Sequence, residues 1–373
     1  MNNKPLKFIE KIFSIKNNDY YKMLCVLGVK IKLPTPKLII RATETRIKQL
    51  ENNLENTLDK IEELKNQLQG ILRMRRHTFD DSVRDNISMQ EHNDNVANLL
   101  KNLDSKASLN CQKILDRLDT LYYNQTMLVQ DMYDKNEIQI INECRKFRKQ
   151  AKWVDGHWEN GKYKLPINFF EPSVFYHRNG VVAIQNPAKI NGKTILDVGC
   201  YVCDSVLVFR EEFPDSPIIS FEPSEVNYNL AVQTIGLNNL QNVKVENIGL
   251  GDKNCTMSIS IGGGGGSTIM NKNNTNSVIV QRLDDYVLDN HIDNIGLIKV
   301  DIEGFEQNFL KGATQTIKKF KPTMLLSIYH NYSDFFKIKP LIESWNLGYK
   351  FDFFHGTLEN TAEDEILLIC EVQ

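Results

Sequence analysis

The sequence predicts an α/β domain with a mostly parallel, seven-stranded sheet and an antiparallel C-terminal hairpin, preceded by a long α-helical coiled coil. Two observations support this prediction. Short apolar runs alternate with helix-sized spacers through residues 151–373, and apolar residues recur every seven positions near residues 47–71. We therefore divide the chain into an arm (1–40), a coiled-coil or helical stalk (41–150) and an α/β domain (151–373).

The composition excludes several protein classes. Of the 373 residues, 41% are hydrophobic and 25% are charged, as in ordinary globular proteins. The net charge of −2 indicates no nucleic-acid partner, and no apolar run approaches the roughly 18 residues of a membrane span. Seven scattered cysteines do not form a disulfide framework, and the N-terminus lacks a secretion signal. We expect a cytoplasmic protein with reduced cysteines.

The arm, residues 1–40, is basic, with eight lysines against Glu10 and Asp19. Apolar residues lie at helical spacing between Phe8 and Phe13, whereas the runs Met23–Val29 and Lys30–Leu33 indicate strands. Two interpretations stay open. The arm either packs on its own protein, or it contacts an anionic membrane surface or a partner enzyme.

The stalk, residues 41–150, contains no proline and a single glycine, Gly70. One set of seam positions is Ile47, Leu54, Ile61 and Leu68, and the other is Leu50, Thr57, Leu64 and Ile71. A weaker seven-residue repeat returns from Leu100 to Leu128. The pattern fits an antiparallel helical hairpin or a parallel stalk, and it favours a homo-oligomer, a dimer or trimer, through residues 43–72.

The α/β domain contains seven predicted strands. They are Thr194–Val198, Pro217–Phe221, Val243–Ile248, Leu297–Val300, Thr323–Ile328, Tyr349–Phe354 and Glu365–Cys370. The first five are separated by helix-sized spacers and the last two lie close together, as in a parallel sheet that ends in a hairpin.

Chemistry is expected where these strands end, because open α/β sheets bind ligands outside the carboxyl ends of their strands. The first strand contains Asp197 and runs into Gly199, where backbone can approach a ligand closely. The second strand is followed by Glu222, 25 residues after Asp197. An acidic residue at this place can accept both hydroxyls of a ribose. The pair predicts a nucleotide-like cofactor.

The segment from Ile195 to Cys370 resembles the FkbM-type family of S-adenosylmethionine-dependent methyltransferases. The resemblance rests on Ile298-Lys-Val-Asp-Ile-Glu-Gly-Phe-Glu306, on Leu310-Lys-Gly-Ala313 and on Arg282-Leu-Asp-Asp-Tyr286. The run Ser327-Ile-Tyr-His330, with Asp334, is similar to a bacterial surface-polysaccharide branch. The implied fold is a Rossmann-like class I methyltransferase domain.

The resemblance also implies roles for residues of this chain. Asp197, Gly199 and Tyr201 would line the methionine part of S-adenosylmethionine, Glu222 would hold the ribose, and Asp252 would lie near the adenine. Cys203 stands where the family usually has glycine, so its side chain either crowds the cofactor's carboxylate or points into the sheet. The resemblance assigns Tyr176, His177 and Tyr329 to the acceptor.

Methyl transfer to a hydroxyl needs a base beside the cofactor. His330 is the first choice because histidine titrates near neutral pH, and Asp301 and Glu303 are the alternatives. Lys299 lies two residues before Asp301, on the same side of the strand, and forms a catalytic or structural pair with it. Asp301, Glu303 and His330 are conceivable metal ligands, but these residue types do not require a metal. Cys200 and Cys203 have thiol–disulfide spacing, although two small residues filling a turn explain them equally.

The predicted function is O-methylation of a sugar hydroxyl in a surface glycan (capsule, lipopolysaccharide or precursor) during polysaccharide biosynthesis. The expected partners are a sugar or glycan acceptor, further copies of the chain, and a glycan-assembly enzyme or the inner face of the cell membrane. Two other functions remain open: a scaffolding protein with a degenerate cofactor fold, and a nucleotide-sugar glycosyltransferase. The glycosyltransferase fits less well because no Asp-x-Asp follows a strand.

Overall fold

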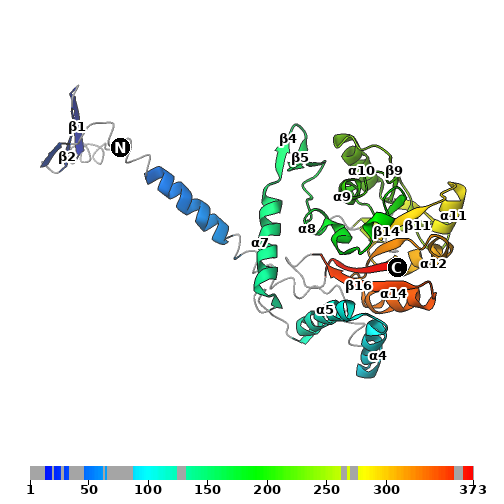
Figure 1. The fold of residues 1–373 in the computed structure, drawn as a ribbon. Helices are drawn as coiled ribbons and strands as arrows, with labels where there is room; N and C mark the ends of the chain where they lie inside the picture. The colour runs from blue at the N-terminus through cyan, green and yellow to red at the C-terminus, as the bar shows by residue number, and fades with distance from the viewer. Residues whose placement is uncertain are drawn as a thin grey trace. The chain divides into compact units, whose positions relative to one another are not determined.

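The computed structural model describes residues 13–18, 21–26, 29–32, 46–61, 64, 87–123, 132–261, 267–268, 276–356 and 364–372. The chain divides into two compact units, Met1–Leu68 and Gln69–Gln373, which we describe separately (Figure 1).

The first unit contains a small antiparallel sheet and a helix. The sheet has the order β1-β2-β3, with β1 at Phe13–Asn18, β2 at Tyr21–Val26 and β3 at Val29–Lys32. Strands β2 and β3 cover most of the two predicted strand runs of the arm. Residues 8–12 of the predicted helical segment lie outside the described residues, and Phe13 begins a strand. Residues 46–61 are helical, as the heptad pattern predicts.

A seven-stranded sheet forms the centre of the second unit, in the order β16-β17-β15-β14-β7-β8-β9. Its strands are β7 (Thr194–Val198), β8 (Ile218–Phe221), β9 (Val243–Glu246), β14 (Ile295–Val300), β15 (Thr323–Ser327), β16 (Tyr349–His355) and β17 (Ile366–Val372). Neighbouring strands are parallel except that β17 runs antiparallel to both β15 and β16. The predicted α/β sheet and its antiparallel hairpin are confirmed.

Helices cover both faces of this sheet, which explains why its central strands are buried throughout and mostly apolar. Alternate residues point to opposite faces, so Ile195 joins one buried cluster and Leu196 the other. The helices after β7 are α9 (Asp204–Glu212), α10 (Glu225–Leu237), α11 (Leu283–Asp289), α12 (Glu306–Gly312), α13 (Thr314–Phe320) and α14 (Tyr332–Ser344).

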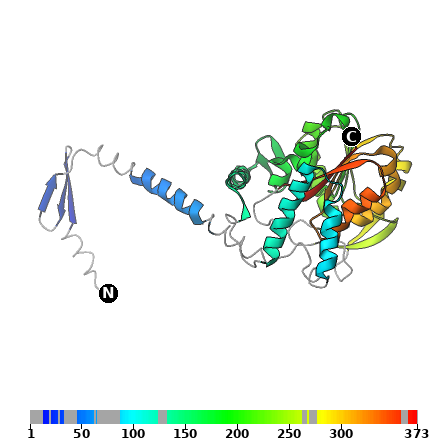
Figure 2. The ribbon, with the colours of Figure 1, turned by 60° about the horizontal axis from the view of Figure 1, so that its bottom comes forward.

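The second half of the predicted stalk packs on this domain. Helices α4 (Met89–Leu100) and α5 (Ser105–Tyr123) lie against α14 and β16 (Figure 2). Leu99, Ile114 and Leu115 are at most 4% exposed and belong to the same core cluster as β14 and β15. Lys339 of α14 is fully buried and donates to the carbonyl of Lys101 at the end of α4 (2.6 Å). Residues 87–123 are therefore part of the α/β domain, which the predicted boundary at residue 151 leaves out.

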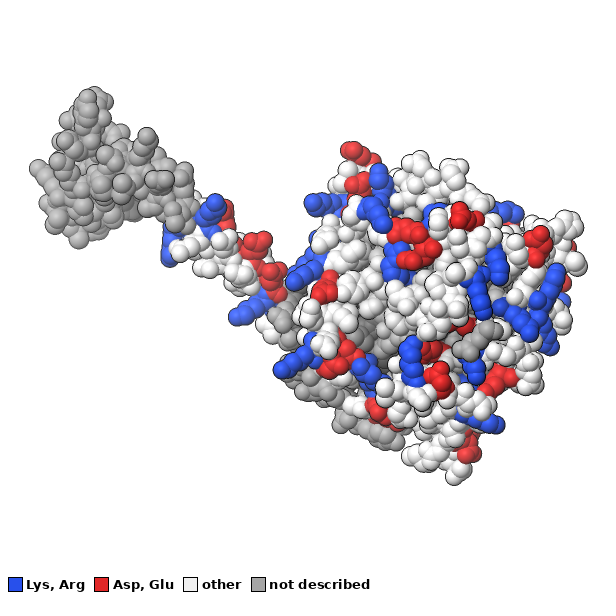
Figure 3. All heavy atoms as spheres, in the orientation of Figure 1, with Lys and Arg blue, Asp and Glu red and all other residues white. Residues whose placement is uncertain are grey.

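The remaining elements surround the sheet. They are α7 (Lys135–Lys149), β4 (Lys152–Val154), β5 (His157–Asn160), β6 (Tyr163–Leu165), α8 (Pro172–Phe175), η1 (Arg178–Ala183), η2 (Pro187–Lys189), β10 (Gly249–Leu250), β11 (Cys255–Ile261), β12 (Ser267–Thr268) and β13 (Asn276–Gln281). Basic and acidic side chains are interspersed over the face of this unit seen in Figure 3. Within the described part of the chain, no helix has the length and apolarity that a bilayer span requires.

Candidate active site

Two adjoining clefts open at the carboxyl ends of β7, β8 and β14. The first cleft, of about 610 Å³, is lined by Glu222, by apolar residues that include Phe305, and by the loops after β7 and β14. The second cleft, of about 720 Å³, extends from these loops toward α8 and Tyr329. Both share Gly199, Tyr201, Asp301 and Glu303 as walls. The position agrees with the rule that open α/β sheets bind ligands at this edge.

Tight backbone turns bring the strand ends together. Gly199 has φ +78°, and a Cβ placed there would lie 1.8 Å from the carbonyl oxygen of Asp301, so only glycine fits. Tyr201, Cys203 and Glu303 also have positive φ values of 48°, 59° and 56°. Non-glycine residues rarely adopt this conformation, and such residues often gather at functional sites.

Glu222 lies in the first cleft with both carboxylate oxygens held by the backbone. Oε2 accepts from the Tyr201 amide (3.1 Å) and Oε1 from the Ser224 amide (2.9 Å). Burial raises the pKa of Glu222 to about 7, although these hydrogen bonds favour its charged form. The carboxylate is thus oriented before any ligand arrives.

Asp197 and Lys299 form a buried ion pair between adjacent strands. The two residues are direct register partners of β7 and β14, and Lys299 Nζ lies 3.3 Å from Asp197 Oδ1. Lys299 also donates to the Gly199 carbonyl (2.8 Å), and Asp197 accepts from Ser205 Oγ (2.6 Å). Burial opposes charge on Lys299, but Asp197 and nearby carboxylates raise its pKa above the usual range. Lys299 lines the second cleft, whereas Asp197 lies behind it.

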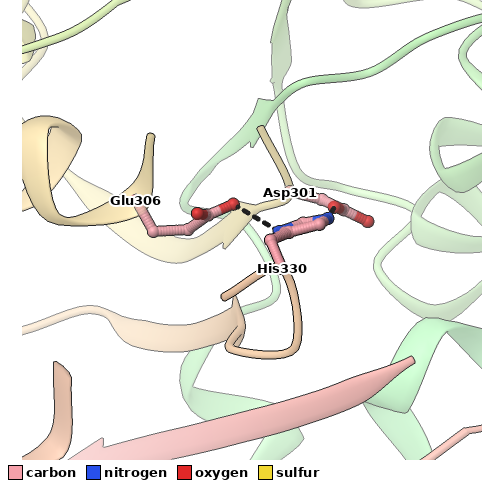
Figure 4. Close-up of side chains that lie close together, drawn as sticks. All are labelled: Asp301, Glu306 and His330. Atoms are coloured by element: carbon pink, nitrogen blue, oxygen red, sulfur yellow. Dashed lines mark hydrogen bonds and ion pairs between the residues drawn. The ribbon is translucent and has the colours of Figure 1, made fainter. Parts of the chain in front are cut away.

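Three further side chains meet where the two clefts join (Figure 4). The imidazole of His330 lies between Glu306, 3.0 Å from Nδ1, and Asp301, 3.2 Å from Nε2. Glu303 Oε2 is 3.8 Å from the same Nε2. Of these residues only Asp301 and Glu303 line the clefts, while the His330 side chain is 7% exposed and lies behind them.

The carboxylates around His330 control its protonation. Burial opposes the charged imidazole, but Glu306 and Asp301 raise the pKa of His330 well above its usual value. The Asp301 carboxyl is likewise penalised by burial, and its hydrogen bond to His330 and the charge of Lys299 hold its pKa at about 2. Burial raises the pKa of Glu303. His330 is therefore an imidazolium paired with ionised Asp301. Beside this pair lies the Glu303 carboxyl, whose pKa is raised.

Part of the chain is similar to known proteins. Residues 197–353 match the methyltransferase FkbM domain. Methyltransferase 1 of Beauveria bassiana (strain ARSEF 2860) is 23% identical over 211 residues, which cover 50% of this chain and 83% of the relative. The match confirms the FkbM-type resemblance, whereas the surface-polysaccharide branch stays a prediction.

Two solved structures align with the chain at lower similarity. Methyltransferase FkbM from Methylobacillus flagellatus KT aligns with a TM-score of 0.46 and 17% identity over 75% of this chain. The alignment covers 59% of that protein, less than two thirds of its length. Fibrillarin of Aeropyrum pernix, crystallised with natively bound S-adenosylmethionine, aligns with a TM-score of 0.31 and 13% identity, covering 49% of this chain and 68% of its own.

The first cleft has the chemistry that S-adenosylmethionine requires. Ile248, Leu250 and Phe305 give it an apolar end that suits a purine, and Glu222 offers oriented acceptors for the ribose. Gly199 lets the loop after β7 pass directly against the Asp301 carbonyl, so both loops can line the cleft. These residues would hold the cofactor in the first cleft.

Cys203 does not obstruct either cleft. Its side chain is fully buried in the core cluster that contains Val206 and Phe209, so it points into the domain. Its φ of 59° explains why glycine suits this position. Cys200 is also buried, and both are free thiols.

Several residues implied by the resemblance lie away from the cleft walls. Asp252 is exposed after β10 and does not line the first cleft. Tyr176 donates its hydroxyl to Glu143, and half-buried His177 packs against Phe354. Tyr329 does line the second cleft.

The sequence alone did not predict the acidic lining of the second cleft or the carboxylate behind His330. Asp204, Glu171 and Glu365 come from three separate segments, so no local motif marked them. Glu306 was visible within the Ile298–Glu306 block, but its contact with His330 needed the fold. The ligand atoms of Asp301, Glu306 and His330 lie within 4.8 Å of one another, a grouping that a metal ion could use. However, the two carboxylates face opposite ring nitrogens, which favours the ion-paired arrangement.

Proposed function

We propose that the protein is an S-adenosylmethionine-dependent O-methyltransferase that acts on a sugar hydroxyl of a surface glycan or its precursor. The observation that supports methyl transfer best is the pair of clefts sharing Asp301 and Glu303, because donor and acceptor would then meet at one wall. The sugar acceptor and the role in polysaccharide biosynthesis rest on the resemblance of the Ser327–His330 run to the corresponding branch.

The cofactor would lie in the first cleft. When bound, S-adenosylmethionine supplies an electrophilic methyl group. Glu222 would hold the ribose hydroxyls through a carboxylate that Tyr201 and Ser224 already orient. Asp301 and Glu303 place negative charge where the positive sulfonium would lie.

Glu303 is the best-placed proton acceptor for the acceptor hydroxyl. It lines both clefts, and its raised pKa brings it closer to the operating pH, where a general base is most effective. His330 is buried behind it, and so acts as a positioning residue that fixes the charges of Asp301 and Glu303. This assignment replaces His330 by one of its two sequence alternatives.

Cofactor binding is tested by titrating the full chain with S-adenosylmethionine and S-adenosylhomocysteine in a calorimeter. Glu222→Ala should weaken binding by about 1–3 kcal/mol, since a ribose held in the cleft would lose a charged acceptor. The matched control is Glu225→Ala, which removes an exposed carboxylate from the start of α10. A parent protein that binds neither compound would support the scaffolding alternative.

The helix at residues 46–61 supports self-association. Five large apolar side chains of this helix are between 49% and 61% exposed: Ile47, Leu50, Leu54, Leu58 and Ile61. So much exposed apolar surface on one helix indicates an interaction site. A second or third copy of the same helix would bury the heptad positions, so we propose a parallel dimer or trimer through residues 43–72. The basic arm would then be repeated, which would raise its avidity for a glycan-assembly enzyme or the inner membrane face.

A further inference from the structure

The second cleft is lined by more acidic groups than its cations balance. Five carboxyl groups, those of Glu171, Asp204, Asp301, Glu303 and Glu365, face it together with one cation, Lys299. An excess of buried negative charge destabilises an empty cavity and favours a cationic ligand.

Protein partners account for three of these carboxyl groups. Arg148 pairs with Glu171. His330 lies 3.2 Å from Asp301 and 3.8 Å from Glu303. Two carboxyl groups remain, those of Asp204 and Glu365.

Asp204 and Glu365 have no direct ion pair of this kind among the described residues, although the charge of Lys299 lowers the pKa of Asp204. In the ranges that the structure describes, no ion pair within 4.0 Å involves either residue. Asp204 is 5% exposed and accepts from the Ser205 amide (2.9 Å), and Glu365 accepts from Ser173. Burial raises the pKa of Asp204 to about 7 and that of Glu365 to about 8. Both carboxyl groups would become fully ionised beside a ligand cation.

Asn179 adds an independent sign of a ligand. Its side-chain amide lines the same cleft, the residue is 9% exposed, and Nδ2 is buried with no hydrogen-bond partner. A buried donor without a partner is energetically costly unless a ligand oxygen accepts its hydrogen bond. Tyr329 provides a further hydroxyl on the cleft wall. The lining therefore combines sites for ligand hydroxyl groups with sites for a positive charge.

We propose that the second cleft binds an acceptor sugar that carries a protonated amino group, which Asp204 and Glu365 hold. This inference rests on the proposed function for the position of the methyl donor, and it specifies the acceptor class within it. The polar lining, with Asn179 and Tyr329 on the same wall as the carboxyl groups, suits a ligand that carries hydroxyl groups beside its positive charge. An anionic sugar would meet the uncompensated carboxylates and be rejected.

The test is calorimetric titration of the full chain, saturated with S-adenosylhomocysteine, with D-glucosamine and with N-acetyl-D-glucosamine. The two probes share the ring, and acetylation removes the charge. D-glucosamine should bind about tenfold tighter or more, the scale of one charge-assisted hydrogen bond. At pH 7 its binding should release protons, because the ammonium lowers the pKa values of Asp204 and Glu365, so the heat should differ between phosphate and Tris buffers.

Two isosteric variants locate the effect. Glu365→Gln and Asp204→Asn should each reduce the preference for D-glucosamine and the proton release, while S-adenosylhomocysteine affinity stays within about twofold of the parent value. The control Glu225→Gln removes an exposed carboxylate and should change neither quantity. The unchanged affinity for S-adenosylhomocysteine also shows that the variants are folded.

Equal affinities for the two probes in the parent would overturn the proposal. So would variants that weaken S-adenosylhomocysteine in place of D-glucosamine, because Asp204 and Glu365 would then serve the cofactor's own amino group. If the parent binds no S-adenosylhomocysteine, the proposed function fails. The same probes, titrated without it, still decide the charge preference of the cleft.

Discussion

Glu306 Oε1 lies 3.0 Å from His330 Nδ1 and accepts the Ile302 amide at 2.9 Å, so the loop after β14 and the loop after β15 meet at one fully buried carboxylate. The contact turns the other ring nitrogen, Nε2, toward Asp301 and Glu303. One buried acid thus sets the direction of the imidazole at the cleft wall, a positioning role known from other histidine sites.

We expect Glu303→Gln to reduce kcat by about 10²–10⁴-fold, the usual contribution of a general base, because glutamine cannot accept the proton. Affinity for S-adenosylhomocysteine should stay near the parent value. Steady-state kinetics together with calorimetry measure both. A variant with near-normal kcat would return the role of base to Asp301 or His330.

His330→Gln should move the rate profile to higher pH. The rate rises as Glu303 loses its proton, and the imidazolium lowers the pKa of Glu303 while Asp301, Glu306 and Asp364 raise it. Removing the positive charge therefore raises that pKa and shifts the ascending limb toward alkaline pH. Exposed His291→Gln is the matched control. If the ascending limb of the pH–rate profile stays at the same pH in His330→Gln, His330 has only a structural role.

The pKa of His330 also predicts how stability depends on pH. Because the folded pKa lies above the unfolded value of 6.5, the stabilisation is full below pH 6.5 and is lost as pH rises through the folded pKa. Asp301, with a folded pKa of about 2, keeps its contribution above its ordinary value of 3.8 and loses it as pH falls toward 2. Urea unfolding of parent and His330→Gln should therefore differ more at pH 6 than at strongly alkaline pH. An equal difference at both values would contradict the pairing.

Removal of core side chains from α5 should destabilise the whole α/β domain. Leu115 is 4% exposed in the core cluster beneath the sheet, and truncating such a residue costs about 2–5 kcal/mol. Leu115→Ala should lower the urea midpoint of the transition that also reports the central sheet. Leu109 of the same helix is 71% exposed, and Leu109→Ala should change stability by less than about 0.5 kcal/mol.

Charge placed on the exposed apolar residues of the helix at residues 46–61 tests the proposed self-association. Leu54→Asp together with Ile61→Asp should yield monomers in sedimentation, because aspartate at seam positions would bury charge. Asn52→Asp together with Asn56→Asp adds the same two charges at positions outside the seam and should preserve the oligomer. A parent protein that is itself monomeric would contradict the proposed dimer or trimer.

Much of the sheet could be predicted because its strands are short, apolar and buried on both faces. Thr194–Val198 and Thr323–Ser327 are buried throughout, and their bounds match the predicted runs within one residue. The docking of α5 could not be predicted. Its seven-residue repeat is as compatible with a sheet face as with another helix, and only the fold places Ile114 against the domain.

The candidate site could likewise be predicted only in part from the sequence. Glu222 and Asp301 follow strands directly, so the rule on strand ends predicted their position. Glu365 and Asn179 enter the second cleft from segments 186 residues apart, and no local spacing relates them. Tyr176 and His177 do not line either cleft, because a matching dipeptide does not determine the direction of its side chains.

The pairing of Asp197 with Lys299 across β7 and β14 has a consequence for how these two positions can change during evolution. Loss of either partner alone would leave the other as a buried charge without its ion-pair partner, at a cost of about 3–5 kcal/mol. A lineage that replaces one residue would thus pass through a poorly folded intermediate unless both replacements came together. We expect the two positions to vary together among homologous sequences, as an apolar pair or as an ion pair, and mixed combinations to be rare.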